Sequence, residues 1–359
     1  MQTIAITDMH MNERLRLTVY ATVLAVTFGW ILYIGKNVFV PIVFSVLVVY
    51  VIVGVTRLLF KIPLLRSLLP PQIGYVLAAL VIALALAGIA SLLANNLGKV
   101  AALAPQYSAS LLNSIQGIAS RMGIEVAPTW TTLRQELLAQ VNTQRLIGTT
   151  VVSVSSIVST LIVVLLYVAF LLVEQRALSA KLAKISDDPR NVAQIQKIVT
   201  HINARIGTYL ALKTMVSVVQ GLVCWAILAW FGVEFAMFWA VLIGLLNYIP
   251  YIGSFLGVAL PVAFATMQFA DAGTVIAILL ALSAVQFVIG FFLDPYVLGN
   301  SLNLSPFAIL VSLAAWSALW GIAGAFLAVP ITACMALVFA EFEGTRPVAV
   351  LLSRTGDVL

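Results

Sequence analysis

The chain has 359 residues, of which 62% are hydrophobic and 9% are charged, and its formal net charge is +6. Because soluble domains carry about 25% charged residues, this composition excludes an ordinary soluble protein and indicates an integral membrane protein. The apolar stretches lack the alternation of barrel strands, so we expect helices of about 20 residues that span the bilayer. The basic residues lie in loops beside these stretches, which favours a topology signal over a nucleic-acid surface.

Eight apolar elements follow one another along the chain. Six have the length of simple spans: residues 17–35, 38–60, 73–97, 149–173, 208–232 and 272–293. No small-residue cleavage site follows the first, so we expect it to be retained rather than removed as a signal peptide. Two longer blocks, 236–269 and 305–340, would each be about 50 Å long if straight, against a hydrocarbon core of about 30 Å. The predicted fold is an all-α integral membrane protein of about eight transmembrane elements, two of them broken or re-entrant hairpins.

Basic residues set the predicted orientation. They precede the first span and gather after the second and fourth, at Arg14, Arg16, Arg57, Lys61, Arg66, Arg176, Lys181, Lys184, Arg190, Lys197 and Arg205. Because Lys and Arg are enriched in cytoplasmic loops, we expect the N-terminus and the C-terminus to be cytoplasmic.

Two polar segments separate the spans. Residues 98–148 show helical spacing of apolar residues around a break at Ala127-Pro128, which predicts a pair of amphipathic helices outside the membrane. They would form either a packed cap or oligomer contact, or a lid over a vestibule. In the second segment Asp188 suits an N-cap and Pro189 the first helical position, and the apolar stripe that follows predicts a helix along the inner membrane face.

These elements divide the chain into five predicted regions. They are an N-terminal three-helix segment (1–97), an outer helical insertion (98–148), the fourth span with a basic interfacial helix (149–207), a membrane half with two broken elements (208–341) and a C-terminal tail (342–359).

Enzymatic chemistry finds little support. The two histidines, His10 and His201, have no nucleophile or metal ligand at a suitable spacing, and no P-loop or dinucleotide glycine pattern occurs. Cys224 and Cys334 lie in apolar runs, where they act as small hydrophobic residues. We therefore expect no enzyme, no cofactor and no metal.

Polar residues inside spans are the main functional candidates, because burying them in hydrocarbon is costly. Lys213 and Gln220 are seven residues apart and share a helix face, so they could line a polar path, although Lys213 could instead snorkel to the interface. Gln286 lies in the 272–293 element, where a hydrogen bond between helices is the alternative to a role in the path.

The first long block contains LLNYIPYIGSFLGVALP, residues 245–261. Pro250 removes a backbone donor and Gly253 permits left-handed or extended backbone, so the helix should break between them. We expect a hairpin that dips into the membrane and turns near Tyr248–Gly253, a stretch that includes Tyr251 and directly follows Asn247. A kinked, tilted span is the alternative.

The second long block has the same layout. It reads PFAILVSLAAWSALWGIAGAFLAVPITA over residues 306–333, with Gly321 and Gly324 midway, and Pro330 aligns with Pro261 of the first block. Interrupted segments in corresponding positions point to a transporter's binding site. Trp316 and Trp320 could complete an amphipathic wall with the two tyrosines, although Trp and Tyr also mark membrane interfaces.

A polar linker, FFLDPYVLGNSLNLSP, joins the two blocks over residues 291–306. Asp294 is the acid placed nearest to the candidate site, which makes it our first choice for proton or cation coupling, with an interfacial cap as the alternative. Asn300 and Asn303 add further polar groups to the predicted pathway.

Three motifs together resemble the AI-2E family, also described as autoinducer-2 exporters or PerM-like permeases. They are LNYIPYIGSFLGVALP, DPYVLGNSLNLSP and WGIAGAFLAVPITA, and the resemblance in layout covers nearly the whole chain. The chain departs from common family patterns at Ser254 and Ser305, where relatives often have proline and histidine. The resemblance implies a bacterial inner-membrane transporter that forms a homo-oligomer, with a pentamer as one candidate.

Three functional hypotheses follow. The first is a secondary transporter or exporter that moves a small, polar, autoinducer-2-like solute by alternating access. The second is an antiporter that exchanges Na⁺, Li⁺ or K⁺ for protons at Asp294, and the third is a membrane scaffold without transport. The expected partners are the lipid bilayer and either the solute or a monovalent cation and a proton, with no nucleic acid.

Overall fold

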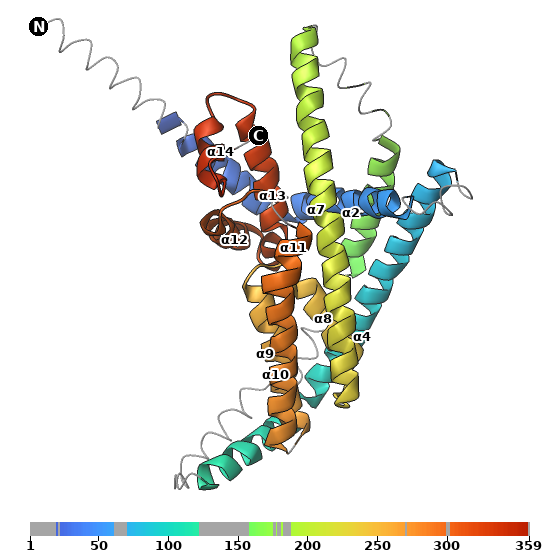
Figure 1. Cartoon of the computed structure of the whole chain (residues 1–359), viewed down its shortest axis with the longest axis vertical. Coiled ribbons are helices and arrows are strands. Elements are labelled where there is room, and N and C mark those ends of the chain that lie inside the picture. The colour runs from blue at the N-terminus through green and yellow to red at the C-terminus, as the bar shows by residue number, and fades with distance from the viewer. Residues whose placement is uncertain are drawn as a thin grey trace, which may run out of the picture.

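The computed structural model is helical in nearly all the residues that it describes, namely 19–20, 22–60, 70–121, 158–174, 177, 181, 188–269, 271–298 and 302–357 (Figure 1). The main helices are α2 (Lys36–Leu59), α4 (Pro71–Arg121), α7 (Pro189–Trp230), α8 (Ala236–Leu246), α9 (Ile252–Gln268), α10 (Ala272–Val288), α11 (Asp294–Leu298), α12 (Pro306–Trp320), α13 (Ile322–Ala340) and α14 (Arg346–Leu352). A π-helical turn, η1 (Ile289–Leu293), joins α10 to α11. The predicted all-α class is confirmed for this part of the chain.

Five helical stretches of the described chain are long and apolar enough to cross a membrane. They are Lys36–Thr56, Ile73–Asn96, Pro189–Trp230, Ala272–Leu298 and Ile322–Ala340. Shorter apolar helices, Thr22–Ile34 and Val158–Glu174 among them, add to these five, so the predicted eight elements are not all full-length spans. Only Gly35 separates Thr22–Ile34 from α2, and its N–H donates to Ile31 O at 2.8 Å.

Helix α7 begins as the sequence predicts but continues further. Asp188 is its N-cap and accepts a hydrogen bond from Arg190 N at 2.9 Å, with Pro189 at the first position. The expected separate helix along the membrane face is wrong, because α7 runs unbroken for 42 residues, about 63 Å at 1.5 Å per residue. Helix α2 crosses α7 (Figure 1), and a Cβ added at Gly54 would lie 2.8 Å from Ala211 Cβ. This close crossing packs α7 where the sequence suggests a boundary.

Helix α4 joins two predicted elements. It extends for 51 residues, so the third span continues directly into the first part of the predicted outer insertion. The predicted break at Ala127-Pro128 and the rest of that insertion lie outside the described residues.

Each of the two long apolar blocks divides into two helices that contact each other, α8 with α9 and α12 with α13. Glu234 N donates to Gln268 Oε1, and Gln268 Nε2 donates to Gly232 O, both at 2.8 Å, so the two ends of the α8–α9 pair lie together. At the other pair, Ser305 N donates to Leu352 O at 2.8 Å, which holds the start of α12 against the end of α14, the short helix that follows α13.

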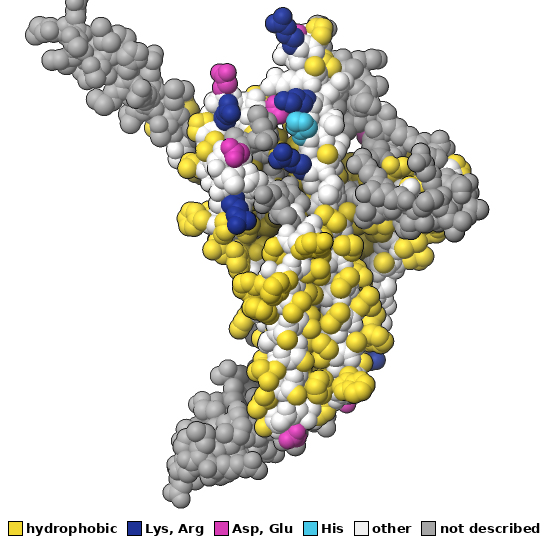
Figure 2. Space-filling model, viewed as in Figure 1, with side chains coloured by type: hydrophobic (Ala, Val, Ile, Leu, Met, Phe, Trp, Pro, Cys, Tyr) yellow, Lys and Arg dark blue, Asp and Glu magenta, His cyan; other side chains and the backbone are white. Residues whose placement is uncertain are grey.

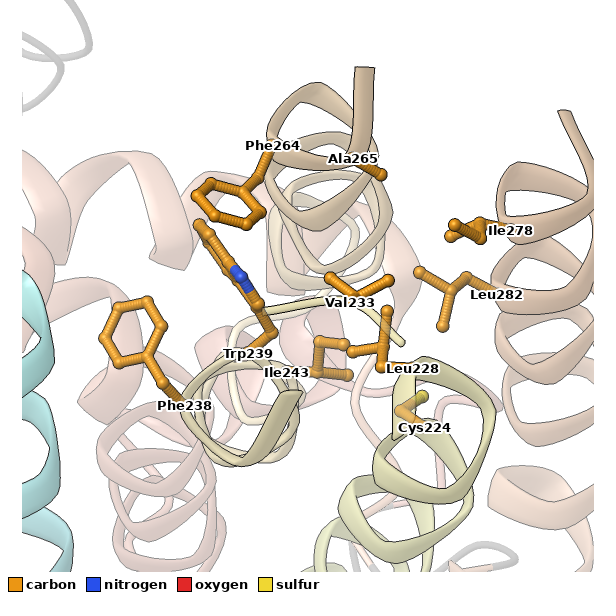
Figure 3. Close-up of a cluster of buried hydrophobic side chains, with 10 residues drawn as sticks. All are labelled: Cys224, Leu228, Val233, Phe238, Trp239, Ile243, Phe264, Ala265, Ile278 and Leu282. Carbon is orange, nitrogen blue, oxygen red and sulfur yellow. The ribbon is translucent and has the colours of Figure 1, made fainter. Parts of the chain in front are cut away.

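Apolar side chains hold these pairs to the long helices. A fully or largely buried cluster joins α7, α8, α9 and α10 (Figure 3), formed by Cys224, Leu228, Val233, Phe238, Trp239, Ile243, Phe264, Ala265, Ile278 and Leu282. The Trp239 ring lies between Phe238, 4.9 Å away, and Phe264, 5.3 Å away, measured between ring centroids. Figure 2 shows apolar side chains along the length of the visible face and charged ones gathered mainly towards its ends, the distribution expected of a protein with a lipid-facing belt.

Candidate solute site

A cleft of about 740 Å³ opens where α7, the α8–α9 break and the η1–α11 segment meet. Its lining mixes polar groups with apolar walls: Tyr209, Lys213, Asn247, Tyr248, Ile249, Pro250, Tyr251, Ser254, Gln286, Phe287, Gly290, Phe291, Asp294, Leu298, Leu302, Asn303, Leu304, Ile309, Val329 and Arg354. A cleft of this size, mostly apolar with a few convergent polar groups, is typical of sites that bind small molecules.

An ion pair lies at the centre of the polar groups. Lys213 Nζ is 2.9 Å from Asp294 Oδ2, and it donates a second hydrogen bond to Asn247 Oδ1 at 3.2 Å. Asn247 Nδ2 in turn donates to Ser217 Oγ at 3.1 Å. The two charged side chains are 8% and 23% exposed, so the Lys213 ammonium group is held inside the protein. Asp294 Oδ1 is buried and has no hydrogen-bond partner among the described residues.

Two tyrosines pack beside this ion pair. The Tyr248 hydroxyl lies 2.6 Å from Thr214 Oγ1, and its ring stacks on Phe326 of α13 with centroids 4.5 Å apart. Tyr209, one helical turn before Lys213 on α7, also lines the cleft. Tyr248 therefore connects the α8–α9 break to α7 and to the α12–α13 pair.

The backbone of the α8–α9 break is strained. Tyr251 has φ 61° and ψ −56°, and Ile252 N donates to Pro250 O at 2.6 Å, which together form the rare γ-turn with a positive central φ. The sequence placed this freedom at Gly253, and that expectation is wrong. Gly253 is needed for another reason, because a Cβ there would lie 1.8 Å from Leu246 O. Strain of this kind persists where the surrounding structure imposes it, commonly at functional sites.

The π-helical turn η1 brings Asp294 to the cleft. Pro295 has no N–H to bond the carbonyl four residues earlier, and its ring crowds that carbonyl. The chain responds with a wider turn, in which Asp294 N donates to Ile289 O, five residues back. Such π-turns are frequent at functional sites. No periodicity in the sequence predicts the extra residue, although Pro295 marks its place.

A second polar pair lies further along α7. Gln220 Nε2 donates to Gln286 Oε1 at 2.8 Å, and Gln220 is fully buried, with no partner for its own Oε1 in the described part of the chain. The Gln286 amide covers Gly257, where an added Cβ would lie 3.0 Å from Gln286 Nε2. Along one face of α7, polar side chains follow one another at helical spacing: Lys213, Ser217 and Gln220. With their partners Asp294, Asn247 and Gln286 they form a polar column, which ends at Cys224 and the apolar cluster of Figure 3.

The second break differs from the first in its place. Gly321 has φ 62° and ψ −138°, a conformation that favours glycine, and a Cβ at Gly324 would lie 1.8 Å from Trp316 O. Trp320 is only 7% exposed, and its Nε1 donates to Leu32 O at 2.9 Å. The cleft lining does not include the two glycines and two tryptophans of this break, so the expected wall of tryptophans and tyrosines is not assembled there.

The structure brings together eight of the residues singled out from sequence: Lys213, Asn247, Tyr248, Pro250, Tyr251, Gln286, Asp294 and Asn303. Gln220 and Gly253 lie just behind the lining, whereas Trp320, Gly321 and Gly324 belong to the other break, and Asn300 lies outside the described residues. Sequence reasoning missed Tyr209 and Ser217, which share the Lys213 face, and Arg354, for which no local pattern gives a signal. The described residues contain no group of three His, Cys, Asp or Glu that could hold a metal ion.

The long apolar helices, together with a cleft in which a few charged and polar groups converge, define a multi-pass membrane protein with the features of a transporter. The profile of the AI-2E family transporters matches residues 21–344. The chain is 30% identical over 302 residues to the AI-2 transport protein TqsA of Escherichia coli (strain K12), a match that covers 81% of this chain and 85% of TqsA. It therefore belongs to the AI-2E transporter family, as the three motifs indicate.

Two further relatives carry names of candidate transport proteins. A protein of Borreliella burgdorferi is 34% identical over 195 residues, which cover 54% of each chain. YhhT of Escherichia coli (strain K12) is 25% identical over 287 residues, which cover 78% of this chain and 79% of YhhT.

Proposed function

We propose that the protein is a secondary transporter or exporter that moves a small polar solute through the cleft beside Lys213 and Asp294. The observation that carries this proposal is a network of charged and amide groups at a strained helix break inside an apolar helical bundle. Polar groups in such a position are costly, and they mark solute or ion pathways. Because TqsA is named as an AI-2 transport protein, an autoinducer-2-like molecule is the first solute to test.

The two helix pairs would act as re-entrant hairpins that enter the bilayer of the inner membrane from opposite faces. The ends of the α8–α9 pair lie at Gly232, beside the C-terminal end of α7. The α12–α13 pair ends at Glu341, whose Oε2 lies 3.4 Å from Lys197 Nζ near the N-terminal end of α7. Irregular backbone at membrane depth is tolerated where protein buries it or where it lines a cavity, as it does at Tyr251.

Orientation follows from the basic residues that favour the N-terminal end of α7, which we assign to the cytoplasm together with both termini. A cysteine introduced at Ser301, with Cys224 and Cys334 replaced by serine, tests the assignment in intact cells. Two opposed hairpins place Ser301 inside, where an impermeant thiol reagent cannot reach it until the membrane is opened. Labelling of Ser301→Cys in intact cells would instead mean that both blocks cross the membrane.

Alternating access would use the apolar cluster of Figure 3 as the closed end of the path. The polar column from Asp294 to Gln286 stops there, so solute movement requires the α8–α9 pair to shift against α7 and α10. We also expect a homo-oligomer.

Transport is tested with autoinducer-2 in membrane vesicles from cells that make the protein. Asn247→Ala and Asp294→Asn should each abolish most of the protein-dependent flux, because they break the network around Lys213. Asn95→Ala is the matched control, since that amide bonds only Ser91 on α4 among the hydrogen bonds resolved for it. If all three variants transported equally well, the cleft would not be part of the solute pathway. If neither the wild-type protein nor any variant transported the solute, the result would favour a membrane scaffold without transport.

Exchange of a monovalent cation for protons is the second candidate function. It is favoured by Asp294 Oδ1, a buried carboxylate oxygen beside the cleft for which the described residues supply no hydrogen bond. Proton movement measured in vesicles with sodium, lithium or potassium pulses would reveal the exchange, and Asp294→Asn should remove it. A complete absence of cation-dependent proton movement excludes this function while leaving solute transport intact.

A further inference from the structure

The segment Ser353–Asp357 is fastened to the linker that closes one side of the cleft. Arg354 N donates to Asn303 O at 3.0 Å, and an antiparallel bridge pairs Leu304 with Ser353. The Asn303 side chain adds a hydrogen bond from Nδ2 to Asp357 O at 2.6 Å. Asn303 itself has φ 45°, a left-handed conformation that asparagine tolerates better than most residues. The backbone pairing therefore holds this segment in a defined place.

Arg354 thereby becomes part of the cleft wall. It lines the cleft together with Asn303 and Leu304, far from Lys213 in the sequence. The charged residues in the described lining are Lys213, Asp294 and Arg354. Lys213 and Asp294 neutralise one another at 2.9 Å, whereas the side chain of Arg354 is exposed and takes part in none of the ion pairs found among the described residues. The described lining thus carries one excess positive charge, at its solvent-exposed side, and a cleft lined by an excess of one sign attracts ions of the other.

We propose that the cleft takes a small hydroxylated organic anion with one negative charge, and that Arg354 provides the charge which selects it. Tyr251 and Ser254 supply neutral hydroxyl groups in the same lining, which suit the hydroxyls of such a solute. A planar guanidinium binds a carboxylate or a similar oxyanion through two parallel hydrogen bonds. The proposal rests on the proposed transport function only in using the same cleft.

Thiol reagents of opposite charge measure this selectivity without knowledge of the solute. Ser254→Cys, in a chain with Cys224→Ser and Cys334→Ser, places an exposed thiol in the cleft lining. The probes are the sulfonatoethyl and trimethylammonioethyl methanethiosulfonates, applied to the purified full chain in detergent. The ratio of their reaction rates, divided by the ratio at a free small thiol, reports the potential in the cleft.

We expect the anionic reagent to be favoured at Ser254→Cys, and Arg354→Gln to lower the corrected ratio roughly five- to tenfold at low salt, an effect that added salt should shrink. Arg354→Lys should keep most of the preference, because the charge remains. Arg346→Gln is the matched control, an exposed arginine on α14 outside the lining, and it should leave the ratio unchanged. A ratio that is the same for Arg354→Gln and Arg346→Gln overturns the proposal.

Protection by a bound anion gives an independent readout. Glycerate should slow the modification of Ser254→Cys by a neutral methanethiosulfonate, whereas glycerol, of the same chain length, should not, and Arg354→Gln should lose the protection. Equal protection by glycerate and glycerol, or none by either, counts against a monoanion site. Vesicle transport is measured separately, so a chain that selects anions but moves no autoinducer-2 refutes the proposed function and leaves this inference standing.

Discussion

Lys213 Nζ and Asp294 Oδ2 lie 2.9 Å apart, although the two residues are 81 positions apart in the chain. One side chain comes from the middle of α7 and the other from the first residue of α11, after the π-helical turn. Because a buried charge needs a partner, the pair holds α11 against α7 while Asn247 joins the α8–α9 break to the same ammonium group. Any movement of these elements during transport must first rearrange this contact.

Removing one partner should be worse for stability than removing both. Asp294→Ala leaves the Lys213 ammonium buried without its counterion, at a cost of about 3–5 kcal/mol, whereas Lys213→Met with Asp294→Leu should unfold close to the wild-type temperature. Thermal unfolding in detergent measures the difference. All these variants should lose transport if the pair belongs to the pathway.

The exposed pair of Lys181 and Glu174 supplies the control for this comparison. Lys181→Met should change the unfolding free energy by no more than about 1 kcal/mol, because exposed pairs contribute little. If Asp294→Ala lowered the unfolding free energy no more than Lys181→Met does, the Lys213–Asp294 pair would not contribute to stability.

The sequence predicts most of the fold because long apolar runs and their interruptions are local signals. Pro250, Gly253 and Gly321 place both breaks within a few residues, and Lys213 stands out in the sequence as a charge inside a span. The pairing of Lys213 with Asp294 could not be read in this way, because it depends on the crossing of helices distant in the chain. The same is true of Trp320, whose indole reaches Leu32 on another helix instead of the cleft.

Two predictions were wrong where tertiary packing overrides the local conformational preference of the sequence. The basic segment after Pro189 looks like a surface helix by its apolar stripe, yet α7 continues because α2 packs against Gly207 and Ala211. The positive φ fell on Tyr251, a residue with no intrinsic preference for it, because Gly253 was already required for the close approach to Leu246.

Both breaks should fail when a methyl group is added at their close approach. Gly253→Ala and Gly324→Ala each place a Cβ 1.8 Å from a backbone carbonyl oxygen, of Leu246 and Trp316 respectively, and backbone cannot rotate away as a side chain can. We expect a loss of stability at or above the upper end of ~1–3 kcal/mol, together with lower yields of folded protein.

Gly88→Ala is the matched control for these two variants, because a Cβ at Gly88 meets nothing within 4 Å and the residue lies inside helix α4. It should be neutral or stabilising by up to about 1 kcal/mol, from helix propensity. Normal folding and transport in Gly253→Ala would show that the two helices are not held this close.

A capping carboxylate at the start of α10 should make stability sensitive to acid. Asp271 accepts a hydrogen bond from the Thr274 hydroxyl at 2.8 Å and from the backbone N–H groups of Thr274 and Gly273, which lower the pKa of its carboxyl below the ordinary 3.8. A lowered pKa in the folded state means that the carboxylate stabilises the fold above about pH 4, and that this contribution is lost as the pH falls through the folded-state pKa. Thermal unfolding of wild type and Asp271→Ala should therefore differ at pH 7 and converge under strong acid; a constant difference would contradict the capping role.

The Gln220–Gln286 pair lies at the end of the polar column next to the apolar cluster, so variants of this pair test that end separately from the ion pair. Gln286→Leu leaves the fully buried Gln220 amide without its partner and should lower the free energy of unfolding by about 1–3 kcal/mol, whereas leucine at both positions should recover most of that loss.

Gly257→Ala tests the same place through solute flux. It keeps both glutamines but crowds Gln286 Nε2, from which the new Cβ would lie 3.0 Å, so the amide must shift by a few tenths of an ångström. If solute passes this point, Gly257→Ala should reduce vesicle flux severalfold with little change in unfolding temperature. If the variant with leucine at both Gln220 and Gln286 kept full solute flux, the pathway would not extend past Asn247 to these glutamines.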